Sequence, residues 1–379
     1  MNKFEIKIPQ TVLDDLKQRL ARTRWPDEVS DAGWDYGTNL DYLKSLVAYW
    51  QKEFDWRAQE AKLNRFAHFR SEVDGFGLHF IRERGQGPNP TPIILIHGWP
   101  DSFFRMHKII PLLTDPGRYG GSPDDSFDVV VPSIPGFGFS DRPKEKGFTT
   151  KRIADLFAKL MTDELGYKKF AAHGGDWGSS ITEQLAFNHA DSLIGIHLTE
   201  IPYWHLFTVA SEDLSEAEQK YLETGKNWAM IEGAYSMIQA TKPQTLAYGV
   251  NDSPVGLAAW FIEKFRSWSD CEGDVEKRFT KDELLTNLTI YWATETINSS
   301  FRTYYEAQHN RAQNSEKRVE VPTGVAIFPK DLVPAPREFA ERLFNLRHWM
   351  EMPRGGHFAA MEEPGLLAED IRAFFNPLR

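Results

Sequence analysis

The stretch that decides the fold is KFAAHGGDWG, residues 169–178. Its first half is a short, mainly apolar run of the kind expected of a buried strand, and Gly174, Gly175 and Gly178 then surround Asp176. A sharp turn from a strand into a helix needs small residues around its apex, because the backbone there is crowded and strained. The spacing therefore predicts a nucleophile elbow with Asp176 where a serine usually stands. The plainer interpretation is that Asp176 only caps the following helix.

On either side of this stretch the chain alternates short strand-like runs with helical patterns. Continuous apolar runs followed by helices are typical of parallel strands that are buried on both faces of a sheet. The strand-like runs are residues 77–83, 93–97, 127–131, 169–173, 321–328 and 347–352. The pattern predicts an α/β fold with a mostly parallel central sheet flanked by helices.

Two regions interrupt the strand pattern. The first, up to about residue 65, is helical in pattern and has no strand-like runs of its own, so it must pack on something larger. The second is helical and rich in aromatic side chains, and we interpret it as a cap inserted between two halves of the sheet domain. The predicted organisation is an N-terminal segment over 1–75 that packs on the core, the core itself over 76–201 and 316–379, and a helical cap over 202–315.

Two further polar residues follow strand-like runs, at the positions where an α/β-hydrolase fold carries its acid and its base. Asp331 follows the run 321–328, and His357 lies between glycines and Phe358 after the last run. The chain order Asp176, Asp331, His357 matches the nucleophile, acid and base order of that fold. All three residues lie just beyond the carboxyl ends of strands, where such sheets bind ligands. A lone histidine is more often structural, so the prediction depends on the whole set.

A fourth motif, HGWP at residues 97–100, follows the run 93–96. A turn here can direct the backbone N–H of Trp99 into the site, where it would form an oxyanion hole with the N–H of Trp177. The alternative is an ordinary turn at the end of a strand, since Gly and Pro punctuate loops in general. We interpret the next residue, Asp101, as a solvated turn residue.

A carboxylate nucleophile restricts the chemistry. Attack by a serine on an sp³ carbon would leave an ether, whereas attack by Asp176 leaves an alkyl ester that an activated water can cleave at the carbonyl carbon. An aspartate at the elbow therefore argues against an esterase or a peptidase and favours epoxides or haloalkanes as substrates. A halide needs N–H donors and an apolar cradle, while an epoxide oxygen needs a proton donor such as a tyrosine hydroxyl.

At these residues the sequence resembles the epoxide hydrolases, specifically the branch that includes the microsomal and fungal enzymes. The resemblance runs over nearly the whole chain, including an N-terminal segment that in this branch wraps around the sheet domain. The motifs that carry it are TRWP at residues 23–26, YGTN at 36–39, FDWR at 54–57, HGWP at 97–100, PGFGFS at 135–140, GGDWG at 174–178 and RGGHFAA at 354–360.

The resemblance implies a role for each site residue. It implies that Asp176 is the nucleophile, that His357 is the base activating water, and that Asp331 is the acid holding the imidazole. The segment EGAYSMIQ at 232–239 resembles the one bearing the first ring-opening tyrosine and so implies Tyr235. The segment SSFRTYY at 299–305 resembles the one bearing the second, where the register favours Tyr304 and leaves the adjacent Tyr305 as the alternative.

These roles together predict an enzyme that hydrolyses epoxides to vicinal diols through a covalent ester on Asp176. Two other functions are kept beside it. A haloalkane dehalogenase also pairs an elbow aspartate with a following tryptophan such as Trp177, and a ligand-binding protein could be built on the same fold without catalysis. The tyrosine segments and the N-terminal segment argue against the first, and the full set of triad residues argues against the second.

Composition limits the partners. The 379 residues carry 44 basic and 54 acidic side chains, giving a formal net charge of −10, and no basic run or basic–aromatic stripe occurs, so we expect no nucleic-acid partner. The single cysteine excludes an intramolecular disulfide, and no stretch approaches about 20 apolar residues. The microsomal anchor has no counterpart, so we expect a soluble, cytoplasmic protein. The expected partners are a small apolar epoxide and water, with no cofactor or metal, and the resemblance suggests a homodimer.

Overall fold

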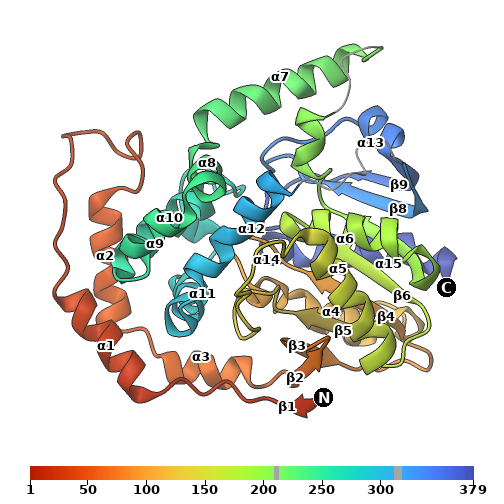
Figure 1. The fold of residues 1–379 in the computed structure, drawn as a ribbon, viewed down its shortest axis with the longest axis horizontal. Helices are drawn as coiled ribbons and strands as arrows, with labels where there is room; N and C mark the ends of the chain where they lie inside the picture. The colour runs from red at the N-terminus through yellow and green to blue at the C-terminus, as the bar shows by residue number, and fades with distance from the viewer. Residues whose placement is uncertain (209–212, 311–317) are drawn as a thin grey trace.

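The computed structural model describes residues 1–208, 213–310 and 318–379 of the chain. Its centre is a nine-stranded sheet in the order β1-β2-β3-β5-β4-β6-β7-β8-β9 (Figure 1). Neighbours from β5 to β9 are parallel, and β1, β2 and β3 extend the sheet by antiparallel pairing. The strands are β1 Asn2–Lys3, β2 His68–Val73, β3 Phe76–Glu83, β4 Thr91–Ile96, β5 Phe127–Pro132, β6 Phe170–Gly174, β7 Leu193–Leu198, β8 Val319–Ile327 and β9 Phe344–Glu351.

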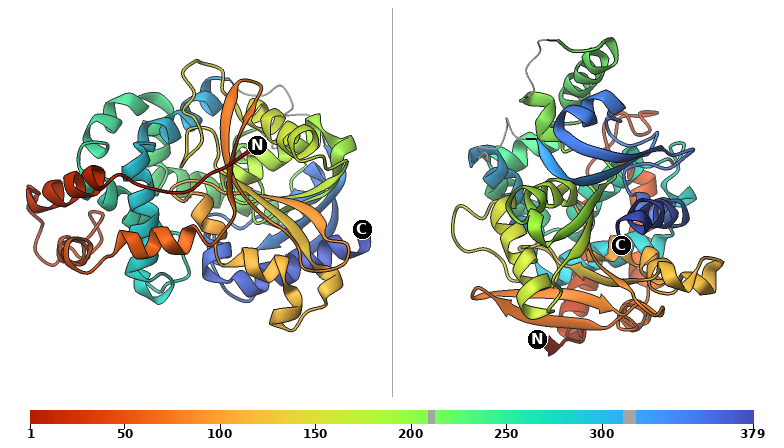
Figure 2. Two further views of the ribbon diagram at one scale, coloured as in Figure 1. Left: turned by 90° about the horizontal axis from the view of Figure 1, so that it is seen from below. Right: turned by 90° about the vertical axis from the view of Figure 1, so that its right-hand side faces the viewer.

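Helices cover both faces of this sheet, which explains why its central strands are apolar throughout. Every residue of β5 and of β6 is buried. Helices α5 and α6 pack together on one face, and α4 and α15 on the other (Figure 2). The helices of this core are α4 Ile109–Thr114, α5 Thr150–Lys159, α6 Trp177–Asn188, α13 Arg337–Leu343, α14 Ala359–Glu362 and α15 Pro364–Phe375. The predicted α/β-hydrolase fold with a mostly parallel sheet is confirmed.

Three strands were absent from the sequence prediction. Strand β2 contains three consecutive polar residues, Arg70, Ser71 and Glu72; β7 is interrupted by Gly195 and His197; and β1 has only two residues. Each of them depends on sheet partners more than on its own pattern. The most consequential is β7, because the residue two positions beyond its end faces the site described below.

A helical layer lies over the carboxyl ends of the parallel strands (Figure 1). It consists of α7 Glu216–Ile231, α8 Ala234–Thr241, α9 Pro243–Val250, α10 Pro254–Ser267, α11 Lys281–Thr294 and α12 Ile297–His309. These helices occupy the region proposed as a cap, and its proposed boundary at residues 315 and 316 lies outside the described residues. Helix α11 is joined to the sheet domain by Asn287, whose Nδ2 donates to the Pro100 carbonyl at 2.8 Å.

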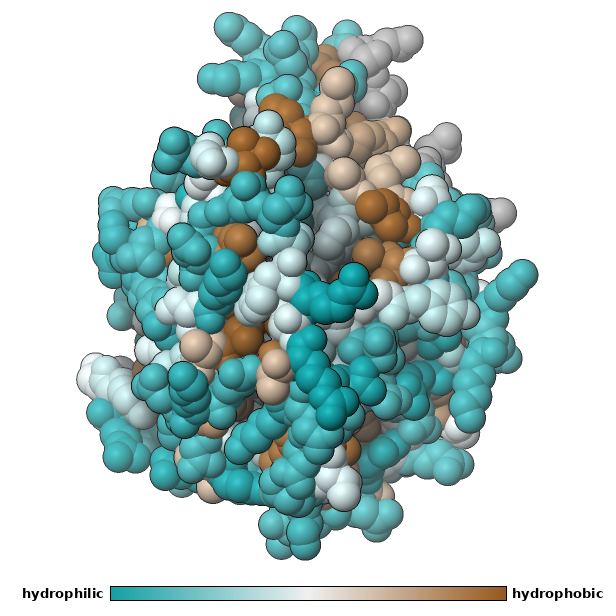
Figure 3. Space-filling view, turned by 90° about the vertical axis from the view of Figure 1, so that its left-hand side faces the viewer, coloured by the Kyte–Doolittle hydropathy of each residue, from teal (hydrophilic) through white to brown (hydrophobic). Residues whose placement is uncertain are grey.

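The N-terminal helices α1 Gln10–Ala21, α2 Leu40–Lys52 and α3 Trp56–Leu63 pack on the cap helices α10 and α11. The Trp50 indole is buried against α11 and donates to Thr289 Oγ1 at 3.2 Å. Figure 3 views the molecule from the side on which these helices lie, and this face is mainly hydrophilic with small separate hydrophobic groups. No helix among the described residues is long and apolar enough to span a bilayer.

Candidate active site

Asp176 stands at a strained turn between β6 and α6. Its backbone has φ 57° and ψ −127°, a conformation that residues other than glycine rarely adopt. Such a conformation costs roughly 1–3 kcal/mol. The neighbouring glycines are required by space. A Cβ on Gly174 would lie 2.1 Å from the Gly178 carbonyl oxygen, and a Cβ on Gly178 would lie 2.1 Å from the Ile96 carbonyl oxygen. The turn therefore holds the Asp176 side chain beyond the end of the sheet.

The two carboxylate oxygens of Asp176 face different partners. Oδ1 accepts a hydrogen bond from the Trp99 backbone N–H at 2.8 Å. Oδ2 lies 3.3 Å from His357 Nε2. Trp177 is the first residue of α6, so its N–H has no acceptor within the helix and is available at the same turn. The arrangement can hold a negative charge on Oδ1 and present Oδ2 to a ligand.

His357 comes from the loop after β9, and Asp331 from the loop after β8. Asp331 Oδ1 accepts a hydrogen bond from His357 Nδ1 at 2.7 Å, which leaves Nε2 facing Asp176. The backbone of His357 is fixed at both ends, because its N–H donates to Trp268 at 2.9 Å and its carbonyl accepts from Arg105 at 2.5 Å. Burial lowers the pKa of His357, but Asp331, Asp176 and Glu200 outweigh burial and raise this pKa well above its usual value.

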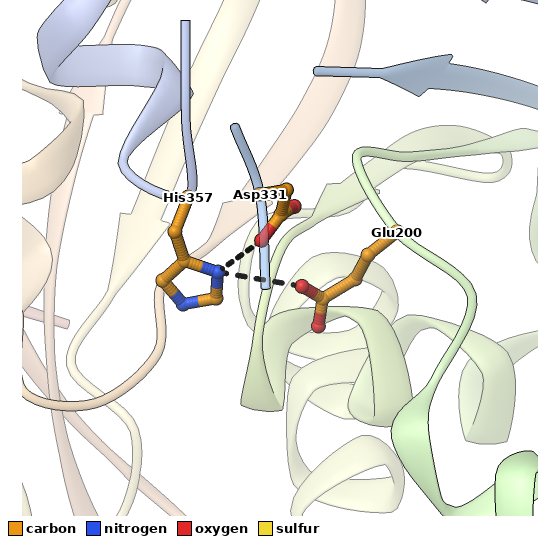
Figure 4. Close-up of side chains that lie close together, drawn as sticks. All are labelled: Glu200, Asp331 and His357. Carbon is orange, nitrogen blue, oxygen red and sulfur yellow. Dashed lines mark hydrogen bonds and ion pairs between the residues drawn. The ribbon is translucent and has the colours of Figure 1, made fainter. Parts of the chain in front are cut away.

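Glu200 is a third carboxyl group that the sequence prediction missed. It follows β7 by two residues, and its Oε2 lies 3.5 Å from His357 Nδ1 (Figure 4). The signal that could have found it is the run 193–198, which is apolar apart from Gly195 and His197 and is followed by the polar pair Thr199 and Glu200, just as other runs are followed by site residues. Atoms of Glu200, Asp331 and His357 lie within 4.8 Å of one another, a spacing that could suit a metal ion. In this structure His357 Nδ1 is hydrogen-bonded to Asp331, and Glu200 flanks the same nitrogen without a hydrogen bond of its own.

The interpretation of Asp101 as a solvated turn residue is wrong. Its side chain is 1% exposed, Oδ1 accepts from the Gly98 N–H at 2.8 Å, and Oδ2 accepts from Arg105. Burial raises the pKa of Asp101, but Arg105 and His97 outweigh burial and lower it to about 2. Because Arg105 also binds the His357 carbonyl, this buried ion pair joins the loop of Trp99 to the loop of His357. Sequence alone gave no sign of it, since Arg105 lies in a loop-like stretch.

Tyr235 on α8 and Tyr304 on α12 bring two phenols from the cap over Trp99. The Tyr235 ring stacks on the Trp99 ring with centroids 5.2 Å apart, and the Tyr304 ring stands edge-on to Trp177 at 4.8 Å. The two tyrosine rings are 5.9 Å apart. Burial is the main cause that raises the pKa of each phenol well above its usual value, and Asp176 adds to it.

The alternative tyrosine has different surroundings. Tyr305 is half-buried, and its ring stacks on His309 with centroids 3.9 Å apart. Of the two adjacent tyrosines, it is Tyr304 whose ring contacts Trp99 and Trp177.

Comparisons with known proteins show which family the chain resembles. A family model described as "Epoxide hydrolase N terminus" matches residues 1–106, and one described as "alpha/beta hydrolase fold" matches residues 91–237. The chain is 44% identical over 378 residues to a protein of Stigmatella aurantiaca (strain DW4/3-1) named "Putative epoxide hydrolase", covering 99% of this chain and 85% of that protein. It is 39% identical over 404 residues to epoxide hydrolase 1 of Sus scrofa, covering 99% and 88%.

Solved structures give the same result over the full length. The juvenile hormone epoxide hydrolase of the silkworm Bombyx mori superposes with a TM-score of 0.89 at 30% identity, covering 100% of this chain and 94% of that chain. The epoxide hydrolase of Aspergillus niger superposes with a TM-score of 0.86 at 30% identity, covering 100% and 96%.

Proposed function

This chain belongs to the epoxide hydrolase family and is a hydrolase that acts on epoxides, and we propose that it forms vicinal diols through a covalent ester on Asp176. The observation that carries this proposal is the setting of the Asp176 carboxylate. Its Oδ1 is held by the Trp99 N–H, and its Oδ2 is directed toward the buried imidazole of His357. The nucleophile and the base therefore lie side by side, with His357 Nε2 next to Asp176 Oδ2.

In the first step, Asp176 Oδ2 attacks one epoxide carbon, and the bond from that carbon to the ring oxygen breaks. The electron pair moves to the ring oxygen, which takes a proton from Tyr235 or Tyr304. The raised pKa of both phenols supports this role, because it keeps the proton on each tyrosine until an alkoxide forms. The stacking of Tyr235 on Trp99 supports a short path between the proton donors and the nucleophile.

In the second step, water attacks the carbonyl carbon of the Asp176 ester while His357 Nε2 takes one proton from the water. The negative charge develops on Oδ1, where the Trp99 and Trp177 N–H groups stabilise it. Collapse returns the carboxylate and releases the diol, and the two protons of the water end on the leaving oxygen and on the tyrosinate. Ester formation also neutralises Asp176, whose hydrogen bonding to the imidazole helps to raise the pKa of His357, and so favours the neutral base.

Diol formation from a panel of aryl and alkyl epoxides, measured with Asp176→Ala alongside, tests the proposal. We expect turnover by the wild type that is lost in the variant. We also expect ¹⁸O from labelled water to enter the Asp176 side chain over several turnovers. Diol formation with no label in Asp176 would mean that water attacks the epoxide directly.

A further inference from the structure

Glu200 is a buried carboxyl group to which the proposed reaction assigns no step. It follows β7, the parallel neighbour of the strand that leads to Asp331, so both carboxyl groups reach the same edge of the sheet. Its side chain is 5% exposed, and within the described part of the chain neither of its oxygens has a hydrogen-bond partner. A carboxyl group buried without partners is unfavourable, so its closest polar neighbour is the place to look for its role.

That neighbour is the imidazole of His357. Asp331 Oδ1 takes the Nδ1 proton at 2.7 Å, and Glu200 Oε2 flanks the same nitrogen at 3.5 Å (Figure 4). Two carboxyl groups therefore face one N–H donor, and only a small movement separates Glu200 from a hydrogen bond to it. We propose that Glu200 is a second acid for His357, an inference that rests on the proposed function. Glu200 would be a positioning residue that helps Asp331 to orient the imidazole and that replaces Asp331 when Asp331 is removed.

The charges around Glu200 explain how the exchange can occur. Burial and then Asp331 are the largest causes that raise the pKa of Glu200 well above its usual range, and Asp176 adds to them, while His357 and Arg105 act in the opposite direction. Burial is the main cause that raises the pKa of the nearby phenols, and Glu200 adds to it; these phenols belong to Tyr203, Tyr221 and Tyr235. Glu200 therefore holds its proton more strongly than an ordinary glutamate while the Asp331 side chain lies beside it. Replacing Asp331 removes one of these causes, so the pKa of Glu200 should fall and its carboxyl group should accept the Nδ1 hydrogen bond more readily.

A double-mutant cycle tests this role. Asp331→Ala, Glu200→Gln and the double variant are compared by kcat, by KM and by the pH dependence of kcat, with the rate of alkyl-enzyme formation measured separately in single turnovers. Asp331→Asn replaces Asp331→Ala if the alanine variant does not fold. Glu183→Gln serves as the matched control, because Glu183 is an equally buried glutamate that binds His205 and Trp204.

We expect Glu200→Gln to lower kcat by about threefold alone and by at least tenfold in the Asp331→Ala background, with KM unchanged. In Asp331→Ala, kcat should rise with pH as Glu200 ionises, and that rise should disappear in the double variant. Glu183→Gln should show no such dependence on background. An equal loss of kcat on Glu200→Gln in both backgrounds would overturn the proposed role of Glu200 and leave the proposed function standing. Diol formation that survives Asp176→Ala would overturn the proposed function itself, so the two failures are distinguishable.

Discussion

In the proposed reaction, the ring oxygen takes its proton from one of two phenols that lie close together over the nucleophile. Replacing Tyr235 or Tyr304 by Phe removes one hydroxyl and leaves the ring that packs on Trp99 or Trp177. We expect each replacement to slow alkyl-enzyme formation by about 10- to 100-fold and both together by more, since a general acid contributes roughly 10²–10⁴-fold.

The matched control for this prediction is Tyr305→Phe, because Tyr305 is adjacent to Tyr304 but stacks on His309. It should leave alkyl-enzyme formation nearly unchanged in stopped-flow measurements of tryptophan fluorescence. A large effect of Tyr305→Phe with little effect of Tyr304→Phe would assign the second proton donor to the alternative residue.

At the scale of elements, two strands of the sheet are tied to one helix by a single buried carboxylate. Asp370 on α15 accepts from His197 on β7 at 2.8 Å and from His348 on β9 at 2.7 Å. Burial raises the pKa of Asp370, but the two histidines outweigh burial and lower it to about 2. The hydrogen bond to Asp370 raises the pKa of His348. Since His197 also contacts His173 on β6, the cluster joins α15 to the sheet beneath the site.

This cluster predicts how stability depends on pH. A carboxylate with a lowered pKa in the folded state stabilises the protein above its unfolded pKa of about 4, and this contribution is lost as the pH falls through about 2. We expect Asp370→Asn to lower the free energy of unfolding by about 2 kcal/mol at pH 5, and by clearly less at pH 3. Urea titrations at both values measure it. Glu369→Gln, on the exposed side of α15, should change stability by less than about 0.5 kcal/mol at either pH.

The same scale explains how far the sequence could predict the site. Asp176, Asp331 and His357 could be nominated because each follows a recognisable strand, and strand ends in a parallel sheet lie at one edge. Glu200 escaped because β7 contains Gly195 and His197, which interrupt its apolar pattern. Asp101 and Arg105 escaped for a different reason: a charged pair in a loop looks solvated until the packing of α11 and the His357 loop encloses it.

For the whole molecule, the N-terminal segment reaches the site indirectly through the cap. Trp50 on α2 is buried against α11, and the same helix holds the loop of Trp99 through Asn287 to Pro100 and through the Tyr291 hydroxyl to the Asp101 carbonyl at 2.7 Å. The position of that loop determines where the Trp99 N–H points. The N-terminal segment should therefore stabilise the cap and, through α11, the oxyanion-binding loop.

Two replacements at this junction distinguish buried packing from surface charge. Trp50→Ala removes a side chain that is 2% exposed, and we expect it to lower the free energy of unfolding by about 3–5 kcal/mol. Asp252→Ala removes only an exposed ion pair with Arg19, and we expect a loss below about 1 kcal/mol. Urea unfolding followed by circular dichroism measures both. If Trp50→Ala were as mild as Asp252→Ala, the N-terminal segment would be a loosely attached cover, and the cap would keep its place over Trp99 without it.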